Sequence, residues 1–420
     1  MKKYTYASAF AGIGGMTLGL KDLGFEGLIA WEYDPSSKKK QYAQEAHKLL
    51  HPDIKVEGDI CASDTKEIPD FDVFCFTPPC QAFSLAGKRG GFDDTRGTLT
   101  FEALRIAKDK KPKILFMENV KGLVNHDKGN TMGTIINAIN DIGYIVDFTI
   151  LNSKYFDVAQ NRERVYLIAV REDLIKESPW IDIVGNKMLP KAKKKYQQDG
   201  AKTFNFDWPK EECVRTKLLD FLESYVDEKY YLDQSKTNDL IFELEKDKEK
   251  TSIIEGIAIK EATKKGYDIA QEGDSINFQF PNSKTRRGRV GKNIANTLEA
   301  SNINQGVLEK IDSTNLLGLL NIKGTDQIRR VYGTNGQCPT LTTMQGGMQE
   351  PKIYNNYRIR KLTPTECLRL QSVPQWAIDI LVENFSDSRL YKFAGNGLTT
   401  NVITAIGERI RDLLNTLNAD

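Results

Sequence analysis

The sequence predicts an α/β protein built on a doubly wound parallel sheet, with a second, smaller and irregular domain. Up to about residue 171, short apolar runs typical of buried strands alternate with segments of helical spacing, such as residues 97–108. Polar side chains follow several of these runs, where ligands bind in this architecture. After residue 171 the alternation stops, and from residue 281 onward Gly, Asn, Thr and Arg dominate. Three segments are therefore expected: a first domain over 1–171, a looser domain over 172–385, and a C-terminal segment over 386–420.

Strands are expected at residues 6–10, 28–31, 73–76, 114–117 and 165–170. Within the second domain, the lysine-rich run 191–195 is expected to be a solvated loop and residues 243–250 an exposed helix. Residues 390–413 regain helical spacing, so the C-terminal segment is expected to pack back on the first sheet.

Composition excludes several classes of protein. The six cysteines form no CxxC pair and the three histidines have no metal-ligand spacing, so neither disulfides nor a metal site is expected. No stretch reaches transmembrane length and the N-terminus lacks the apolar run of a signal peptide, which predicts a cytoplasmic protein without a membrane partner. Because the net charge is only +2, nucleic-acid binding would need local basic patches.

The strongest chemical signal is a cysteine behind two prolines. Cys80 follows Pro78 and Pro79 at the end of the apolar run 73–76, and Glu118 ends the run 114–117. A thiol and a carboxylate at one edge of a sheet suit covalent catalysis on an electron-poor ring. A lone cysteine is more often a small buried hydrophobe, but the prolines and the matching carboxylate favour a nucleophile here.

A glycine-rich turn follows the first expected strand. Phe10 is followed by Gly12, Gly14 and Gly15, which would let the backbone approach a ligand at a helix N-terminus. The spacing is not GxGxxG, which argues against a dinucleotide and hence a dehydrogenase. Glu32, after the second strand, is placed to bind ribose hydroxyls, and Asp59 could accept from an adenine amino group. A ribose and an adenine without a diphosphate suggest S-adenosylmethionine.

With these motifs in order, the chain closely resembles the DNA cytosine-5 methyltransferases. The matching segments are residues 10–15, 79–81, 118–120, 160–164, 360–367 and 395–397. The resemblance implies the fold of an S-adenosylmethionine-dependent methyltransferase, with Pro79 and Asn396 beside the cofactor. It also implies that Cys80 attacks cytosine C6 and that a protonated Glu118 hydrogen-bonds N3. Arg164, with Arg162 nearby, would hold the O2 oxygen or orient Glu118. Without the motif, Arg162 and Arg164 would be interpreted as a surface ion-pair cluster.

Two departures from the family pattern lie near the cofactor loop: Thr77 replaces the usual Gly, and Gly397 replaces the commoner Ser or Ala. Because cytosine C6 is inaccessible in a stacked duplex, the resemblance also implies base flipping. Residues 84–97 would close on the flipped base, with glycine hinges and DNA contacts from Ser84, Lys88, Arg89 and Arg96. A plain mobile surface loop is the alternative.

A weak internal repeat marks the expected recognition region. Arg289-Val290 precedes Thr297-Leu298, and Arg330-Val331 precedes Thr340-Leu341. The second copy resembles the target-recognition segment of the family, which makes Gln327, Arg330 and Thr340 candidate DNA contacts. The first copy is either a packing element or part of a basic patch, whose members are Arg286, Arg287, Arg289 and Lys292.

The predicted function is methyl transfer from S-adenosylmethionine to C5 of a flipped cytosine in a specific double-stranded DNA sequence. The alternatives are a tRNA cytosine-5 methyltransferase and a catalytically silent DNA-binding relative. The RNA-acting branch carries Cys-Phe-Thr in its recognition region, whereas here Cys75-Phe76-Thr77 precedes the nucleophile. A bacterial setting is expected, with a monomeric enzyme that either accompanies a restriction endonuclease encoded nearby or acts as an orphan.

Overall fold

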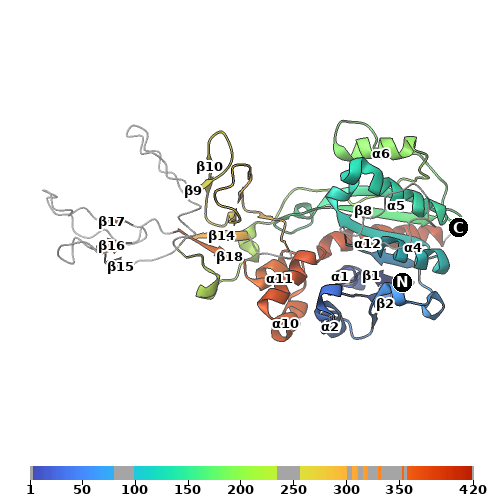
Figure 1. Ribbon diagram of the computed structural model, residues 1–420, viewed down its shortest axis with the longest axis horizontal. Coiled ribbons are helices and arrows are strands. Elements are labelled where there is room, and N and C mark those ends of the chain that lie inside the picture. Colours follow the sequence, from blue (N-terminus) through green and yellow to red (C-terminus); the bar gives the residue numbers. More distant parts are fainter. Residues whose placement is uncertain are drawn as a thin grey trace. The chain divides into compact units, whose positions relative to one another are not determined.

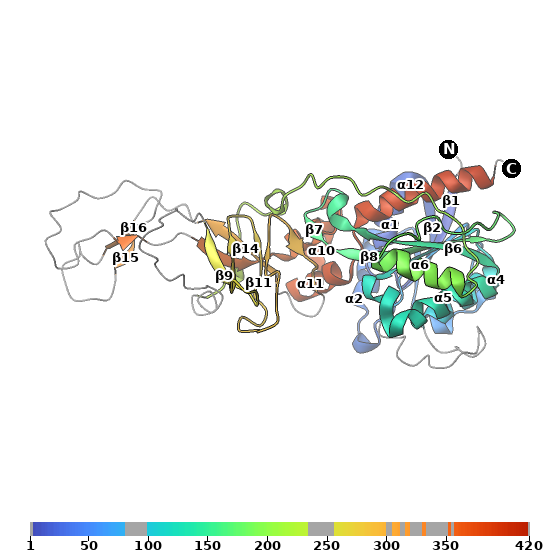
Figure 2. The same ribbon diagram turned by 90° about the horizontal axis from the view of Figure 1, so that it is seen from above.

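The computed structural model describes residues 3–79, 99–233, 256–299, 305–310, 316–319, 330–332, 352–353 and 357–418 (Figures 1 and 2). Two compact units form. Unit 1 comprises residues 1–216, 299–301 and 364–420, and unit 2 comprises residues 217–298 and 302–363. Residues 172–216 and 364–385, which the sequence pattern assigned to the second domain, belong to unit 1 by packing.

Unit 1 is centred on a seven-stranded sheet with the order β3-β2-β1-β4-β5-β8-β6. The strands are β1 (Tyr4–Ala9), β2 (Phe25–Trp31), β3 (Lys55–Glu57), β4 (Val73–Phe76), β5 (Ile114–Val120), β6 (Tyr144–Asn152) and β8 (Glu163–Arg171). Neighbours among β1 to β5 pair in parallel, whereas β8 runs antiparallel to β5 and to β6. The predicted α/β class is confirmed, but the sheet is not purely parallel. The link from β6 to β8 spans only residues 153–162, which is too short for a helical crossover.

Helices cover both faces of this sheet (Figure 1). The described helices of unit 1 are α1 (Gly15–Leu20), α2 (Tyr42–Leu50), α4 (Leu99–Lys110), α5 (Asn130–Asp141), α6 (Met188–Gln198), α9 (Pro364–Arg369), α10 (Gln375–Asn384), α11 (Asp387–Asn396) and α12 (Thr400–Leu417). Successive β4 side chains enter different apolar clusters. Phe74 packs in a cluster with residues of α4 and α5, and Cys75 in one with residues of α12. This alternation is what a strand covered on both faces requires.

One lysine of the run 191–195 contradicts the expectation of a solvated loop. These residues lie in α6, and Lys193 is buried. Its Nζ lies 2.7 Å from Asp147 Oδ1 of β6 and 2.8 Å from Asp182 Oδ2, above the rings of Phe148 and Trp180. Two carboxylates and two aromatic faces therefore replace the water that this ammonium group loses. The helix expected over 243–250 lies outside the described residues.

Unit 2 is built from short strands. They are β9 (Ile257–Lys260), β10 (Tyr267–Ala270), β11 (Ser275–Asn277), β12 (Val290–Gly291), β13 (Ala295–Asn296), β14 (Gln305–Lys310), β15 (Leu316–Leu319), β16 (Arg330–Tyr332), β17 (Lys352–Ile353) and β18 (Tyr357–Lys361). A four-stranded sheet, β12-β11-β14-β18, and the β9–β10 hairpin share a small apolar core that includes Ile259, Ile276, Leu308 and Ile359. Arg289, expected in a surface basic patch, is instead only 1% exposed.

Candidate active site

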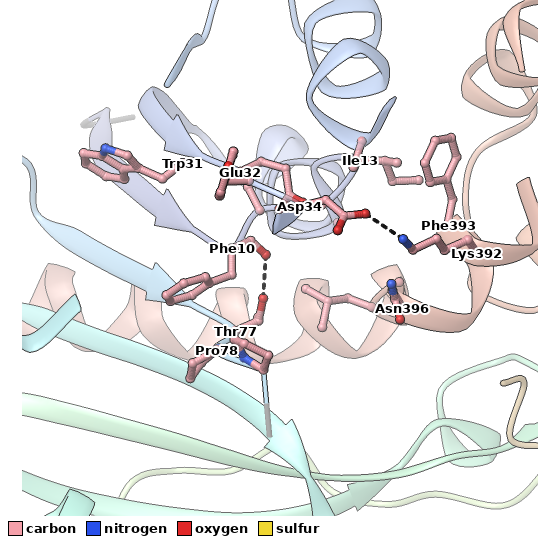
Figure 3. A pocket seen from close by; sticks show the side chains of 18 of the residues that line it. Phe10, Ile13, Trp31, Glu32, Asp34, Thr77, Pro78, Lys392, Phe393 and Asn396 are labelled. Atoms are coloured by element: carbon pink, nitrogen blue, oxygen red, sulfur yellow. Dashed lines mark hydrogen bonds and ion pairs between the residues drawn. The ribbon is translucent and has the colours of Figure 1, made fainter. Parts of the chain in front are cut away.

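A cavity of about 880 Å³ opens at the carboxyl ends of the central strands of unit 1 (Figure 3). Phe10 and Gly12 line it after β1, and Glu32 after β2. Pro79 lines it after β4, and Asn396 at the end of α11. Segments far apart in the sequence thus meet at one sheet edge, where a doubly wound fold binds ligands.

The loop after β1 is held by side chains from two neighbouring strands. The Gly12 N–H donates to Glu32 Oε2 at 2.8 Å, and Thr77 Oγ1 donates to the Phe10 carbonyl at 2.8 Å. Gly12 has φ +56° and a Cβ there would meet nothing within 4 Å, so backbone conformation rather than space requires glycine. Burial raises the pKa of Glu32, and the Gly12 N–H opposes this shift. Only one carboxylate oxygen binds the loop, so the other remains available for a hydroxyl ligand.

Two buried histidines support this loop from α2 and the residue that follows it. His47 Nδ1 lies 3.3 Å from the Gly12 carbonyl, to which it donates, and its ring lies 5.0 Å from that of His51. Gly14 does not line the cavity; a Cβ on it would lie 2.4 Å from His51 Nε2. Burial lowers the pKa of His47 to about 4 and that of His51 to about 3. Both rings are therefore neutral at pH 7, and neither had been singled out in the sequence.

The remaining predicted cofactor residues also lie around the cavity. Asp59 is exposed, and its Oδ1 accepts from the Cys61 N–H at 3.0 Å. Gly15 and Asn396 line the wall. An ion pair that was not predicted from the sequence lies in the same wall and joins Lys392 Nζ to Asp34 Oδ2 at 2.7 Å (Figure 3). Lys392 stands four residues before Asn396, so helical periodicity could have indicated it.

Glu118 sits at the carboxyl end of β5, 8% exposed, with Arg164 Nε 3.2 Å from its Oε1. Burial raises the pKa of Glu118, and Arg164 followed by Arg162 opposes that rise. Next to it, Asn119 Nδ2 donates to the Pro78 carbonyl at 2.8 Å. β5 thus presents a carboxyl group and fixes the backbone two residues before Cys80.

Arg162 makes a different set of contacts from Arg164. Its buried guanidinium donates to the Gly397 carbonyl at 2.7 Å and to the Gly395 carbonyl at 3.3 Å. Burial, with the nearby charge of Arg164, lowers the pKa of Arg162 to about 9, which leaves it cationic at pH 7. These bonds support the turn beside Asn396.

Several predicted residues lie outside the described part of the chain: Cys80, Ser84, Lys88, Arg89, Arg96, Gln327 and Thr340. Arg330 begins β16. Across the described ranges, no cluster of three or more His, Cys, Asp or Glu side chains could hold a metal ion. No described helix is long and apolar enough to cross a membrane.

The sheet order and the cavity at its carboxyl edge define a methyltransferase-type α/β protein. A family model described as C-5 cytosine-specific DNA methylase matches residues 4–412, and the chain belongs to this family of enzymes. It is 34% identical to the orphan methyltransferase M.Rho11sI of Bacillus phage rho11s, over 97% of each chain. It is 30% identical to the type II methyltransferase M.HhaI of Haemophilus parahaemolyticus, over 98% of this chain and 95% of that one.

Solved structures agree on the fold. The Dnmt2 methyltransferase of S. pombe superimposes with a TM-score of 0.53 at 16% identity, covering 99% of this chain and 100% of that one. The Entamoeba histolytica methyltransferase EhMeth gives a TM-score of 0.54 at 14% identity, covering 99% of each chain.

Proposed function

We propose that the protein transfers a methyl group from S-adenosylmethionine to C5 of a flipped-out cytosine in a specific double-stranded DNA sequence. The observation that carries this proposal is the shared edge of β4 and β5. There a buried Glu118 is paired with Arg164, and Asn119 anchors the backbone that leads into Cys80. The family membership supports cytosine in DNA as the substrate.

The cavity suits an adenosyl ligand. Its 880 Å³ is ample for such a molecule. The second Glu32 oxygen would accept from the ribose hydroxyls, Asp59 would accept from the adenine amino group, and the Phe10 ring would pack on the adenine. Gly12, Pro79 and Asn396 would complete the walls. S-adenosylmethionine would supply an electrophilic methyl group on a sulfonium sulfur.

In the proposal, Cys80, Glu118 and Arg164 act on the cytosine base. The Cys80 thiolate adds to C6 and forms an S–C6 bond, which makes C5 nucleophilic. Glu118, whose pKa is raised by burial, would donate to N3 in its protonated form and limit the negative charge on the ring. Arg164 orients Glu118. After methyl transfer a base, for which water is a candidate, takes the C5 proton. The electrons of that C–H bond re-form the C5–C6 double bond, and the S–C6 bond breaks to release the Cys80 thiolate.

The family model and the two sequence relatives favour DNA over tRNA as the substrate, since the model is described as a DNA methylase and the relatives are named as an orphan and a type II methyltransferase. Both kinds of name occur, so either a cognate restriction endonuclease or an orphan role fits. We propose a monomer that acts in the bacterial cytoplasm, where its DNA lies.

A covalent trap tests the proposal. DNA with 5-fluorocytosine at the target cannot lose its C5 substituent as a proton, so the Cys80–C6 adduct should accumulate. We expect a denaturation-resistant protein–DNA band that requires S-adenosylmethionine, disappears in Cys80→Ala and forms more slowly in Glu118→Gln. Bisulfite sequencing of DNA from expressing cells would supply the target. Undiminished DNA methylation by Cys80→Ala would falsify the nucleophile assignment.

A further inference from the structure

Two neighbouring hairpin loops of unit 2 gather cations around an exposed aromatic ring. Residues 261–266 join β9 to β10, and residues 278–289 join β11 to β12. The two-hairpin surface consists of the exposed Lys264, Lys265, Phe280, Lys284 and Arg287 and the half-buried Arg286.

Hydrogen bonds join the two loops. The Ala262 N–H donates to the Arg286 carbonyl at 2.9 Å, and Arg287 Nε donates to the Ala262 carbonyl at 3.2 Å. Within the second loop, Arg286 donates to Asn277 Oδ1 at 2.5 Å and to Gln279 Oε1 at 3.0 Å. The cations are therefore displayed by one connected piece of backbone.

A buried arginine forms the frame of this surface. The Arg289 guanidinium donates to the carbonyl oxygens of Lys260 at 2.8 Å, Asn277 at 2.6 Å, Gln279 at 3.1 Å and Phe280 at 3.1 Å. Removing a guanidinium from water is unfavourable, and here its donors bind main-chain oxygens of both hairpins: the ends of β9 and β11 and the loop that follows β11.

The residue held by this frame is Phe280. Its side chain is 65% exposed and its φ of +51° is uncommon for a residue with a Cβ. The Arg286 guanidinium lies 5.9 Å from its ring centroid. An exposed ring that the backbone holds away from the core indicates a contact with a partner.

The positive charge around the Phe280 ring indicates the chemical class of the partner. The whole chain carries only +2, yet five cationic side chains gather on the two-hairpin surface. Of the nearby acids, Glu261 accepts from the backbone N–H groups of Arg289 and Val290, at 2.6 and 3.2 Å. Glu272 lies beyond the opposite end of β10. A polyanion with apolar surface between its charges matches this arrangement.

We propose that the two-hairpin surface binds double-stranded DNA, in addition to the recognition segment around Thr340. Lys264, Lys265, Lys284 and Arg287 contact phosphates, and Phe280 contacts sugars or bases in the adjoining groove. The inference rests on the proposed function, which makes DNA the substrate.

The test is fluorescence-anisotropy titration of labelled DNA duplex over a range of salt concentrations, with S-adenosylhomocysteine present. Replacing Lys264, Lys265, Lys284 and Arg287 by Ala should weaken binding at least about tenfold and reduce the salt slope by about 0.9 for each phosphate that is no longer neutralised. Phe280→Ala should weaken binding severalfold without changing that slope. Lys191→Ala/Lys194→Ala, two exposed lysines of α6, serves as the matched control and should change neither quantity.

The outcomes separate the two proposals. If the unmodified protein binds DNA and the fourfold variant binds it equally well with the same slope, the two-hairpin surface does not touch DNA. Tighter binding to an RNA duplex of the same sequence, abolished in the fourfold variant, would also overturn the proposal. No DNA binding by the unmodified protein would remove the proposed function and this inference together. Calorimetric cofactor binding should be the same for all variants, which checks that unit 1 folds, and unchanged far-ultraviolet circular dichroism checks that unit 2 folds.

Discussion

The neutral histidine pair beneath the cofactor loop makes the stability of unit 1 pH-dependent in a predictable direction. Burial lowers the pKa of His47 to about 4 and that of His51 to about 3, against about 6.5 in an unfolded chain. Between pH 6.5 and about 4 the unfolded chain therefore binds more protons, so the free energy of unfolding falls as the pH falls. The contribution of the pair is fully present above pH 6.5.

The size of the effect follows from linkage. Each histidine should remove about 1.4 kcal/mol per pH unit below pH 6.5, or about 2 kcal/mol by pH 5. The other charges around the pair are Lys21, which also disfavours a charged His51, and Glu32 on the far side of Gly12. Glu32, Glu118 and Asp147 have raised pKa values, so their protonation at low pH acts in the opposite sense. The change in the free energy of unfolding with pH must therefore be compared between the unmodified protein and a variant that lacks the two histidines.

Urea unfolding at pH 7 and pH 5 provides the assay. All four tryptophans, Trp31, Trp180, Trp208 and Trp376, belong to unit 1, so their fluorescence follows that unit. His47→Asn/His51→Asn cannot titrate, and an asparagine side chain in place of His47 keeps a donor for the Gly12 carbonyl. The double variant should lose up to about 4 kcal/mol less between the two pH values than the unmodified protein. His126→Asn, at an exposed histidine, is the control. An equal loss in the double variant would refute the reasoning.

Three further predictions concern the site. Glu32→Ala should weaken S-adenosylmethionine binding by about one to two decades, because charge-assisted bonds to the ribose are lost; unchanged affinity in calorimetry would remove Glu32 from the site. Asn119→Ala should slow 5-fluorocytosine adduct formation about tenfold with little change in cofactor affinity, because the Pro78 carbonyl loses its donor; an unaltered adduct rate would contradict that role. Exchanging residues 326–343 for those of a relative should change the DNA sequence preference while cofactor binding persists, and methylation of the original site at the original rate would disprove this assignment.

Local patterns predicted five of the seven strands of the unit 1 sheet and the polar residues at their ends, but they did not predict β3 or β6. Val73–Phe76 is fully buried, and its apolar run predicted the strand bounds directly. Glu32 and Glu118 follow or end strands, so topology alone brought them to one edge. The direction of β8 depends on the length of the link before it, which hydrophobic spacing does not encode.

The side chains whose surroundings were not predicted share one physical cause, which is that most of their partners are distant in the sequence. Lys193 is buried because Asp147 lies on β6, 46 residues earlier. His47 contacts Gly12, 35 residues earlier, with no motif to mark the pair. Arg289 is buried because four carbonyl groups converge on it. In each case nothing in the sequence indicated that the side chain would be buried, because the groups that it binds come close only when the chain folds.

Helix α12 covers one face of the sheet to which the N-terminal strand β1 belongs. Val402, Ile403, Ile406, Ile410 and Leu414 of α12 belong to the same buried cluster as Tyr6, Cys75 and Phe116. Tyr4 Oη also donates to Asn415 Oδ1 at 2.7 Å. During synthesis on the ribosome, this face of the sheet stays uncovered until α12 has been translated. A truncated product would expose an apolar surface to aggregation instead of retaining partial activity.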